Sequence, residues 1–226
     1  MIRGIIFDFD GLILDTEMPV YQSWVWLYRY FGLELPFDEW SGIIGTSSAE
    51  HFDPFDRLEA QLGRGLNRET LATQRLNYEL DLVLEQPILP GVVDIITEAE
   101  ARGLRLGVAS SSTRPWVEGH LTRLGLAPRF EVLITAEDVP RTKPDPALFL
   151  RALGALNLQP DEAIVLEDSP NGIAAANSAG IFAVAVPNLL TAQLNLSQAD
   201  MIIESLADVT LDKLLQKALA DGKWIE

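Results

Sequence analysis

The chain has 226 residues, a formal net charge of −16 and no cysteine. A surface of this sign disfavours nucleic acid and anionic lipid as partners, and the lack of cysteine excludes disulfides, thiolate nucleophiles and cysteine-bound metals. With 48% hydrophobic and 22% charged residues, the composition is that of a globular protein with room for a large core and a modest second domain. No segment has the length of a signal peptide core or a membrane span, so we expect a cytoplasmic protein, by default a monomer.

The first predicted element is a short buried strand that ends in two carboxylates. Its apolar residues 5–7 are followed by Asp8 and Asp10, with Gly11 next. Side chains two apart on a strand lie on the same face, so both carboxylates can converge in one small volume. Like charges so close need a metal ion or a shared proton to relieve their repulsion. The pair therefore predicts a nucleophile or metal ligand beside a proton donor, although an isolated pair of this kind more often forms a solvated turn.

A helical pattern then runs from Pro19 to about Gln86. It predicts four helices, over residues 20–31, over residues 37–44, up to Gly63 and over residues 67–85. Aromatic side chains gather in the first of these helices, and we expect them to pack inside this segment rather than bind a ligand; they are Trp24, Trp26, Tyr28 and Phe31.

After the turn signal at residues 87–91, strands and helices alternate. The predicted strands are residues 104–109, 131–134, 163–166, 181–185 and 201–203. Such alternation predicts an α/β fold with a parallel, doubly wound sheet. We expect an α/β core domain of residues 1–15 and 87–226, interrupted by an all-helical domain of residues 16–86.

Polar side chains follow several strands of this predicted sheet. Ser110-Ser111-Ser112 follow the second strand, and Glu167-Asp168 follow the strand at 163–166. Lys143 precedes Pro144-Asp145-Pro146, where we expect Asp145 to be a helix N-cap and Pro146 the first helical residue. Each motif alone is explained by a cap or a turn. Because ligands bind at the carboxyl ends of parallel strands, the motifs together predict one site.

These groups suit phosphoryl transfer, which depends on positioning and charge neutralisation. Asp8 can attack phosphorus to form an aspartyl phosphate. Mg²⁺ between Asp8 and Asp168 can offset the negative charge, because hard oxygen ligands favour it. Ser110 and Lys143 can bind the non-bridging oxygens. Asp10 can protonate the leaving alcohol and then activate water.

The whole chain resembles the haloacid dehalogenase superfamily, specifically its branch of phosphatases and beta-phosphoglucomutase-like enzymes. The first and last of the matching motifs are highly specific, and those between them gain weight from their order. The motifs are Asp8-Phe9-Asp10-Gly11 with Asp15-Thr16-Glu17, Leu89-Pro90-Gly91-Val92, Val108-Ala109-Ser110-Ser111-Ser112, Lys143-Pro144-Asp145-Pro146 and Leu166-Glu167-Asp168-Ser169-Pro170-Asn171-Gly172-Ile173.

The resemblance implies a Rossmann-like core and a helical cap after Asp15 that closes over the site. It implies that Asp8 is the nucleophile and that Asp10 is the general acid and base. It also implies that Mg²⁺ is bound by Asp8, by the backbone carbonyl of Asp10 and by Asp168.

The resemblance further implies that Ser110, Ser111 and Lys143 bind the phosphate. Glu167 is expected to orient Lys143 or a metal-bound water rather than to ligate the metal. Specificity for the leaving group belongs to the cap, where the sequence does not name a substrate beyond a small phosphorylated metabolite. The cap candidates are Glu17, Tyr21, Thr46, Ser47, His51 and Arg57.

Three alternatives follow from the same motifs. Asp10 argues against haloacid dehalogenases and phosphonate-cleaving relatives, which resemble this chain but lack the second aspartate. Sugar phosphomutases of this branch carry a histidine early in the first cap helix and an arginine in the cap loop, where this chain has Val20 and Ser48. A phosphatase is therefore expected ahead of a phosphomutase. A receiver-type signalling switch is a distant third, because its acidic pair is adjacent in sequence and no helical insertion follows it.

Overall fold

The structure, a computed structural model, describes residues 1–41 and 53–221 of the chain. It divides into two compact units, one formed by Met1–Leu14 with Pro87–Glu226 and the other by Asp15–Gln86. The first unit contains the sheet, and the second consists of helices in its described part.

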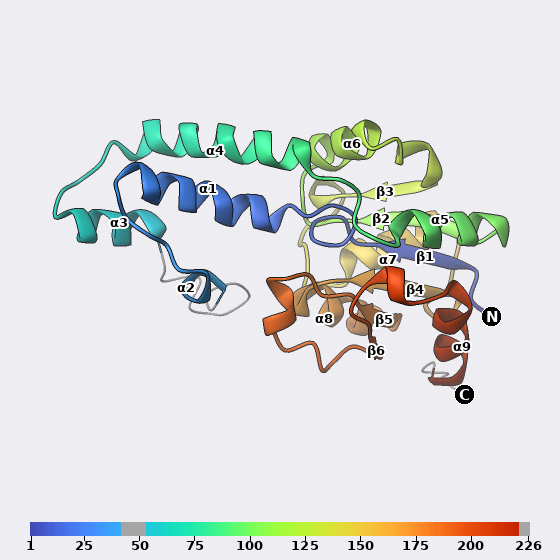
Figure 1. The fold of residues 1–226 in the computed structure, drawn as a ribbon. Coiled ribbons are helices and arrows are strands. Elements are labelled where there is room, and N and C mark those ends of the chain that lie inside the picture. The colour runs from blue at the N-terminus through green and yellow to red at the C-terminus, as the bar shows by residue number, and fades with distance from the viewer. Residues whose placement is uncertain (42–52, 222–226) are drawn as a thin grey trace. The chain divides into compact units, whose positions relative to one another are not determined.

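Six parallel strands form one sheet in the described part of the first unit, in the order β3-β2-β1-β4-β5-β6 (Figure 1). The strands are β1 (Gly4–Phe7), β2 (Arg105–Ala109), β3 (Val132–Ile134), β4 (Ala163–Glu167), β5 (Phe182–Ala185) and β6 (Met201–Ile202). This confirms the predicted doubly wound parallel sheet. Each strand predicted beyond residue 100 is present, with bounds that differ by one residue.

Strand β1 lies inside the sheet, and all four of its residues are buried. Phe7 at its end pairs with Val108 of β2 and with Leu166 of β4. The register is therefore level across the three strands. Because parallel strands end at the same edge, the residues that follow these three strands emerge side by side there.

Helices cover the sheet because its strands are apolar on both faces. Helices α7 and α8 contact each other, and their core includes Ile6, Phe149 and Val165; α5 contacts β2 and α9. The helices are α5 (Val92–Ala101), α6 (Arg114–Arg123), α7 (Ala147–Ala155), α8 (Pro170–Ser178) and α9 (Leu211–Asp221). Single-turn 3-10 helices are η2 (Ala127–Arg129), η3 (Ala136–Asp138), η4 (Pro160–Glu162), η5 (Thr191–Gln193) and η6 (Leu206–Asp208).

The start of α7 differs by one residue from the prediction. Pro146 is the N-cap and Ala147 the first helical residue. Asp145 nevertheless accepts a hydrogen bond from the Ala147 amide at 3.1 Å. Its side chain therefore stabilises the helix start from the position before the N-cap and not from the N-cap itself.

The second unit contains α1 (Glu17–Tyr30), α2 (Phe37–Ser41), α3 (Pro54–Leu62) and α4 (Arg68–Glu85). Helices α1 and α4 run side by side (Figure 1). Their core contains Trp24 and Tyr28, and Trp24 meets Phe55 edge-on at 4.9 Å between ring centroids. Trp26 and Phe31 lie partly buried against the same core, so the four aromatic residues pack inside this unit, as predicted. Among the described residues, no helix combines the length and the apolarity that crossing a membrane requires.

Helix α1 begins at Glu17, three residues before Val20, so the predicted start was wrong. Proline lacks a backbone N–H, but the N–H groups of a first helical turn have no acceptor within the helix, so Pro19 does not delay the start. Oδ1 of Asp15 accepts hydrogen bonds from the amides of Glu17 at 3.2 Å and Met18 at 3.0 Å. The predicted second helix reaches Ile44, and its part beyond residue 41 lies outside the described residues.

Candidate active site

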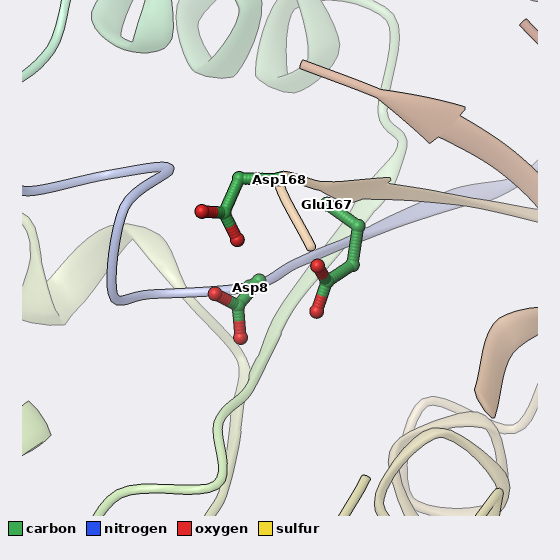
Figure 2. A group of neighbouring side chains, drawn as sticks. All are labelled: Asp8, Glu167 and Asp168. Carbon is green, nitrogen blue, oxygen red and sulfur yellow. The ribbon is translucent and has the colours of Figure 1, made fainter. Parts of the chain in front are cut away.

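Three buried carboxylates converge where β1 and β4 end (Figure 2). Asp8 follows β1, Glu167 is the last residue of β4 and Asp168 comes next; their exposed fractions are 6%, 1% and 2%. One oxygen of each carboxylate lies within 4.8 Å of one oxygen of the other two. The level register of β1 and β4 brings these residues together, because the Asp8 amide still donates to the Leu166 carbonyl at 2.9 Å.

Lys143 places an ammonium group in this cluster. Its Nζ donates hydrogen bonds to Oδ1 of Asp8 and, at 2.6 Å, to Oε1 of Glu167. The same nitrogen lies 4.9 Å from the centre of the Phe149 ring. A buried ammonium with two carboxylate partners is held in place, since leaving it unpaired would be strongly unfavourable.

Both carboxylate oxygens of Glu167 are bound by protein groups. While Oε1 accepts from Lys143, Oε2 accepts from the amide of Ser169 at 2.8 Å and from its hydroxyl at 3.0 Å. Gly172 makes room for this arrangement, because a Cβ there would lie 1.7 Å from Oε1 of Glu167. Glu167 is therefore oriented towards Lys143 and the start of α8.

Asp168 has a partner that the sequence analysis missed. The side-chain amide of Asn188 donates to Oδ2 of Asp168 at 2.8 Å and to the Gly11 carbonyl at 3.4 Å. Gly11 has a φ of 80°, and a Cβ there would lie 2.3 Å from the same oxygen. Asn188 follows β5 by three residues, so a search for polar groups after every strand would have found it.

Asp10 is held by the segment that joins β2 to α6 and by the first turn of α6. Its Oδ2 accepts from the hydroxyls of Ser112 at 2.7 Å and Ser110 at 3.3 Å, and its Oδ1 accepts from the indole nitrogen of Trp116 at 2.9 Å. Ser110 is buried, whereas Ser111 is exposed. The sequence analysis identified the serine run but not Trp116, whose contact depends on how α6 is placed.

The electrostatics of the site are dominated by negative charge. Burial raises the pKa of Asp8 to about 8; Lys143 opposes this shift, and Glu167 and Asp10 add to it. Burial lowers the pKa of Lys143, but Asp8 and Glu167 outweigh it and the pKa is raised. Three carboxylates beside one ammonium leave an excess of negative charge that a divalent cation can neutralise.

The residues predicted to contact the leaving group belong to the second unit. Glu17 is the first residue of α1, and the hydroxyl of Tyr21 donates to the Leu35 carbonyl at 3.0 Å. Arg57 forms an ion pair with Glu39. The remaining candidates, Thr46, Ser47 and His51, lie outside the described residues, as does Ser48.

Comparisons of the sequence with known proteins lead to one family. The family described as haloacid dehalogenase-like hydrolase matches residues 5–186. The Bacillus subtilis (strain 168) protein named "Putative phosphatase YhcW" is 42% identical over 215 residues, which cover 95% of this chain and 97% of that protein. Validoxylamine A 7'-phosphate phosphatase of Streptomyces hygroscopicus subsp. limoneus is 32% identical over 215 residues, with 92% and 96% covered.

Similarity to solved structures leads to the same family as similarity in sequence. The crystal structure of beta-phosphoglucomutase from Clostridium difficile matches with a TM-score of 0.71 and 27% identity, covering 97% of this chain and 98% of its own. The family match spans the first strand, the serine run, Lys143 and the Glu167-Asp168 pair. The chain belongs to the haloacid dehalogenase-like hydrolase family.

Proposed function

We propose that the protein is a Mg²⁺-dependent phosphatase that hydrolyses a small phosphate monoester through an aspartyl phosphate on Asp8. The observation that carries this proposal is the buried carboxylate of Asp8 between a paired ammonium and a second carboxylate, Asp168. Two of the relatives carry the name phosphatase, which supports the reaction class. We expect a monomeric cytoplasmic enzyme for a small phosphorylated metabolite, and because the net charge of −16 repels such an anion, Lys143 and the metal must supply positive charge at the site.

Magnesium would be held by carboxylate oxygens of Asp8 and Asp168 and by the backbone carbonyl of Asp10. The donor set fits this ion, because Mg²⁺ prefers hard oxygen ligands and keeps several waters. When bound, it neutralises charge on the transferring phosphoryl group. Glu167 is not assigned as a ligand, since Lys143 and Ser169 already occupy its oxygens.

The chemistry proceeds in two steps carried by the two aspartates. An oxygen of Asp8 attacks phosphorus, the bond from phosphorus to the ester oxygen breaks, and Asp10 gives its proton to the leaving alkoxide. Water then attacks the phosphorus of the aspartyl phosphate while Asp10 takes a proton from it. Inorganic phosphate leaves, and Asp8 is regenerated as a carboxylate.

The remaining residues bind and orient. Ser110, Ser111 and Lys143 hold the non-bridging phosphate oxygens, and Glu167 positions Lys143. The helical unit of residues 15–86 acts as a cap that selects the leaving group, for which Glu17, Thr46 and Ser47 are the candidates. This division assigns the phosphoryl chemistry to the first unit and substrate choice to the second.

A sugar phosphomutase is the second candidate, favoured by the name of the Clostridium difficile protein. Both reactions share the aspartyl phosphate and differ in what accepts the phosphoryl group from it. A receiver-type switch would be phosphorylated without steady turnover. Sustained release of phosphate therefore argues against the switch. The amount of phosphate released, compared with the amount of isomerised sugar phosphate, separates the phosphatase from the mutase.

The test is phosphate release from a broad panel of phosphate esters, with Mg²⁺ and after complete metal removal with EDTA. We expect hydrolysis only with Mg²⁺, restored when the ion is added back. Asp8→Asn should lower turnover by at least ~10³-fold while the variant still binds substrate. Unchanged hydrolysis after metal removal, or in Asp8→Asn, would contradict the proposal.

A further inference from the structure

Among the described residues, the carboxylate of Asp10 accepts three hydrogen bonds from residues 110–116. Two serine hydroxyls bind Oδ2, whereas Oδ1 is bound by the Trp116 indole at 2.9 Å. We propose that Trp116 is a positioning residue that holds Oδ1 and so fixes the orientation of the Asp10 carboxylate. This inference rests on the proposed role of Asp10 as general acid and base.

The two oxygens of Asp10 differ because their partners differ. An indole N–H can only donate, whereas a serine hydroxyl can donate or accept. Oδ1 therefore has a donor that cannot turn into an acceptor, whereas the hydroxyls at Oδ2 can rotate and leave that oxygen to another partner. The indole thus holds the carboxylate in place while Oδ2 stays available to the substrate.

Oδ2 lies on the side of the proposed phosphate site. It is 3.3 Å from the hydroxyl of Ser110, the buried residue that we propose as a phosphate ligand. A phosphoryl group bound to Ser110 would thus lie nearer Oδ2 than Oδ1. The indole holds the other oxygen and so keeps Oδ2 turned towards Ser110.

Packing fixes the indole itself. Trp116 lies in the first turn of α6 and meets the ring of His120, one turn later, edge-on at 4.4 Å. The buried His120 ring stacks in turn on Phe9, with 6.3 Å between centroids. Phe9 is fully buried and is the neighbour of Asp10 in sequence. The indole nitrogen and its acceptor are therefore both tied to the end of β1.

The leaving group separates this role from a purely structural one. An alkyl phosphate needs general acid catalysis, whereas p-nitrophenolate is stable enough to leave without a proton. Trp116→Phe keeps an aromatic ring against His120 and removes the N–H donor together with the five-membered ring that carries it. Trp26→Phe is the matched control for the smaller ring, because Trp26 stacks on Tyr78 within the second unit.

The experiment compares kcat/KM for the best alkyl phosphate of the panel and for p-nitrophenyl phosphate, because kcat/KM covers the steps up to the aspartyl phosphate and not the later attack by water, which is the same for both esters. For Trp116→Phe we expect kcat/KM on the alkyl ester to fall about tenfold, a part of the 10²–10⁴ that general acid catalysis contributes. The kcat/KM on p-nitrophenyl phosphate should stay within about twofold of wild type, as should both values for Trp26→Phe. Equal loss on both esters, or no loss, would overturn the inference.

Asp10→Asn separates failure of this inference from failure of the proposed function. If Asp10→Asn lacks the selective loss on the alkyl ester, the role of Asp10 itself is wrong. If it shows that loss and Trp116→Phe does not, only the role of Trp116 is wrong.

A second readout does not depend on folding of the Phe variant: the indole N–H resonance of Trp116 in ¹⁵N-labelled protein should move upfield in Asp10→Ala. An unchanged resonance would show that the hydrogen bond is absent.

Discussion

Lys143 donates a hydrogen bond to Oε1 of Glu167 at 2.6 Å, and both side chains are buried. Removing one partner leaves the other charge buried with one partner fewer, and buried pairs respond to this with a loss of about 3–5 kcal/mol. Because Asp8 still pairs with Lys143, we expect Glu167→Ala to lower the free energy of unfolding by about 3 kcal/mol, measured by urea denaturation without metal.

Glu162→Ala is the control for this prediction. Glu162 precedes β4 and pairs with Arg3 at 2.8 Å, but the Arg3 side chain is 53% exposed. Exposed ion pairs contribute at most about 1 kcal/mol, so this variant should unfold close to wild type. Equal losses in the two variants would contradict the importance assigned to the buried pair.

Asn188 provides a test of the metal site that does not require turnover. Its amide holds Oδ2 of Asp168, and loss of such a partner behind a metal ligand weakens binding by about 10–100-fold. We expect Asn188→Ala to raise the dissociation constant for Mg²⁺ by at least about tenfold, measured by isothermal titration calorimetry.

The control must account for a second role of Asn188, whose Oδ1 accepts from the amides of Leu190 and Thr191. Asn195 caps a turn in the same segment, through the Ser197 amide at 3.0 Å, and Asp168 is not among its hydrogen-bond partners. Asn195→Ala should bind Mg²⁺ like wild type. If Asn188→Ala also does so, the amide does not support the metal ligand.

The sheet and its polar edge could be predicted because they depend on local pattern and on one general rule. Apolar runs predict parallel strands, and groups after those strands, such as Asp8, Ser110 and Asp168, must emerge at one edge. Asn188 also follows a strand and could have been found by the same rule, whereas Trp116 could not. Its contact depends on how α6 is placed, which no periodicity in the sequence records.

Two helical glycines test how tightly Glu167 is packed. A Cβ on Gly172 of α8 would lie 1.7 Å from Oε1 of Glu167, whereas a Cβ on Gly154 of α7 would meet nothing within 4 Å. Gly172→Ala should destabilise the protein by about 2 kcal/mol and displace Glu167 from Lys143. Gly154→Ala should be neutral or stabilising by up to about 1 kcal/mol, since alanine favours the helix. Thermal unfolding of both variants checks the pair, and a stable, active Gly172→Ala would contradict it.

The pKa of Tyr28 predicts how the stability of the second unit changes at alkaline pH. Burial raises its pKa from 10.0 to about 12; Arg57 opposes this shift and Asp53 adds to it. The folded state therefore keeps the phenol proton at a pH where the unfolded chain has lost it. Its contribution to stability is complete below pH 10.0 and is lost as the pH rises through about 12.

The measurement is the melting temperature of wild type and Tyr28→Phe between about pH 8 and 12. The variant loses the 2.7 Å hydrogen bond to the Pro54 carbonyl, so it should be less stable by about 1 kcal/mol at the lower pH. The difference should shrink as the pH rises. Tyr30→Phe is the control, because Tyr30 is 71% exposed. A constant difference across the range would mean that Tyr28 does not titrate as expected.

The phosphatase and the phosphomutase differ in what reaches the aspartyl phosphate. A mutase must hold a bisphosphorylated intermediate, turn it round and keep water out, which requires a second cationic clamp and an acid kept idle until the cap closes. At the position of the expected histidine, this chain has Val20, which packs against the apolar core of the second unit. Val20 cannot transfer a proton, so we expect water, and not a sugar hydroxyl, to attack the aspartyl phosphate.

Incubation with beta-glucose 1-phosphate and a trace of the 1,6-bisphosphate distinguishes the two reactions. The phosphatase should release inorganic phosphate from one or both compounds, or leave both unchanged if its cap selects another leaving group. Coupled assays for glucose 6-phosphate and for phosphate, run on the same samples, give the ratio of transfer to hydrolysis. Asp8→Asn should abolish both products, which excludes a contaminating enzyme. Efficient formation of glucose 6-phosphate, with the bisphosphate regenerated and little phosphate lost, would show that the protein is a mutase despite Val20.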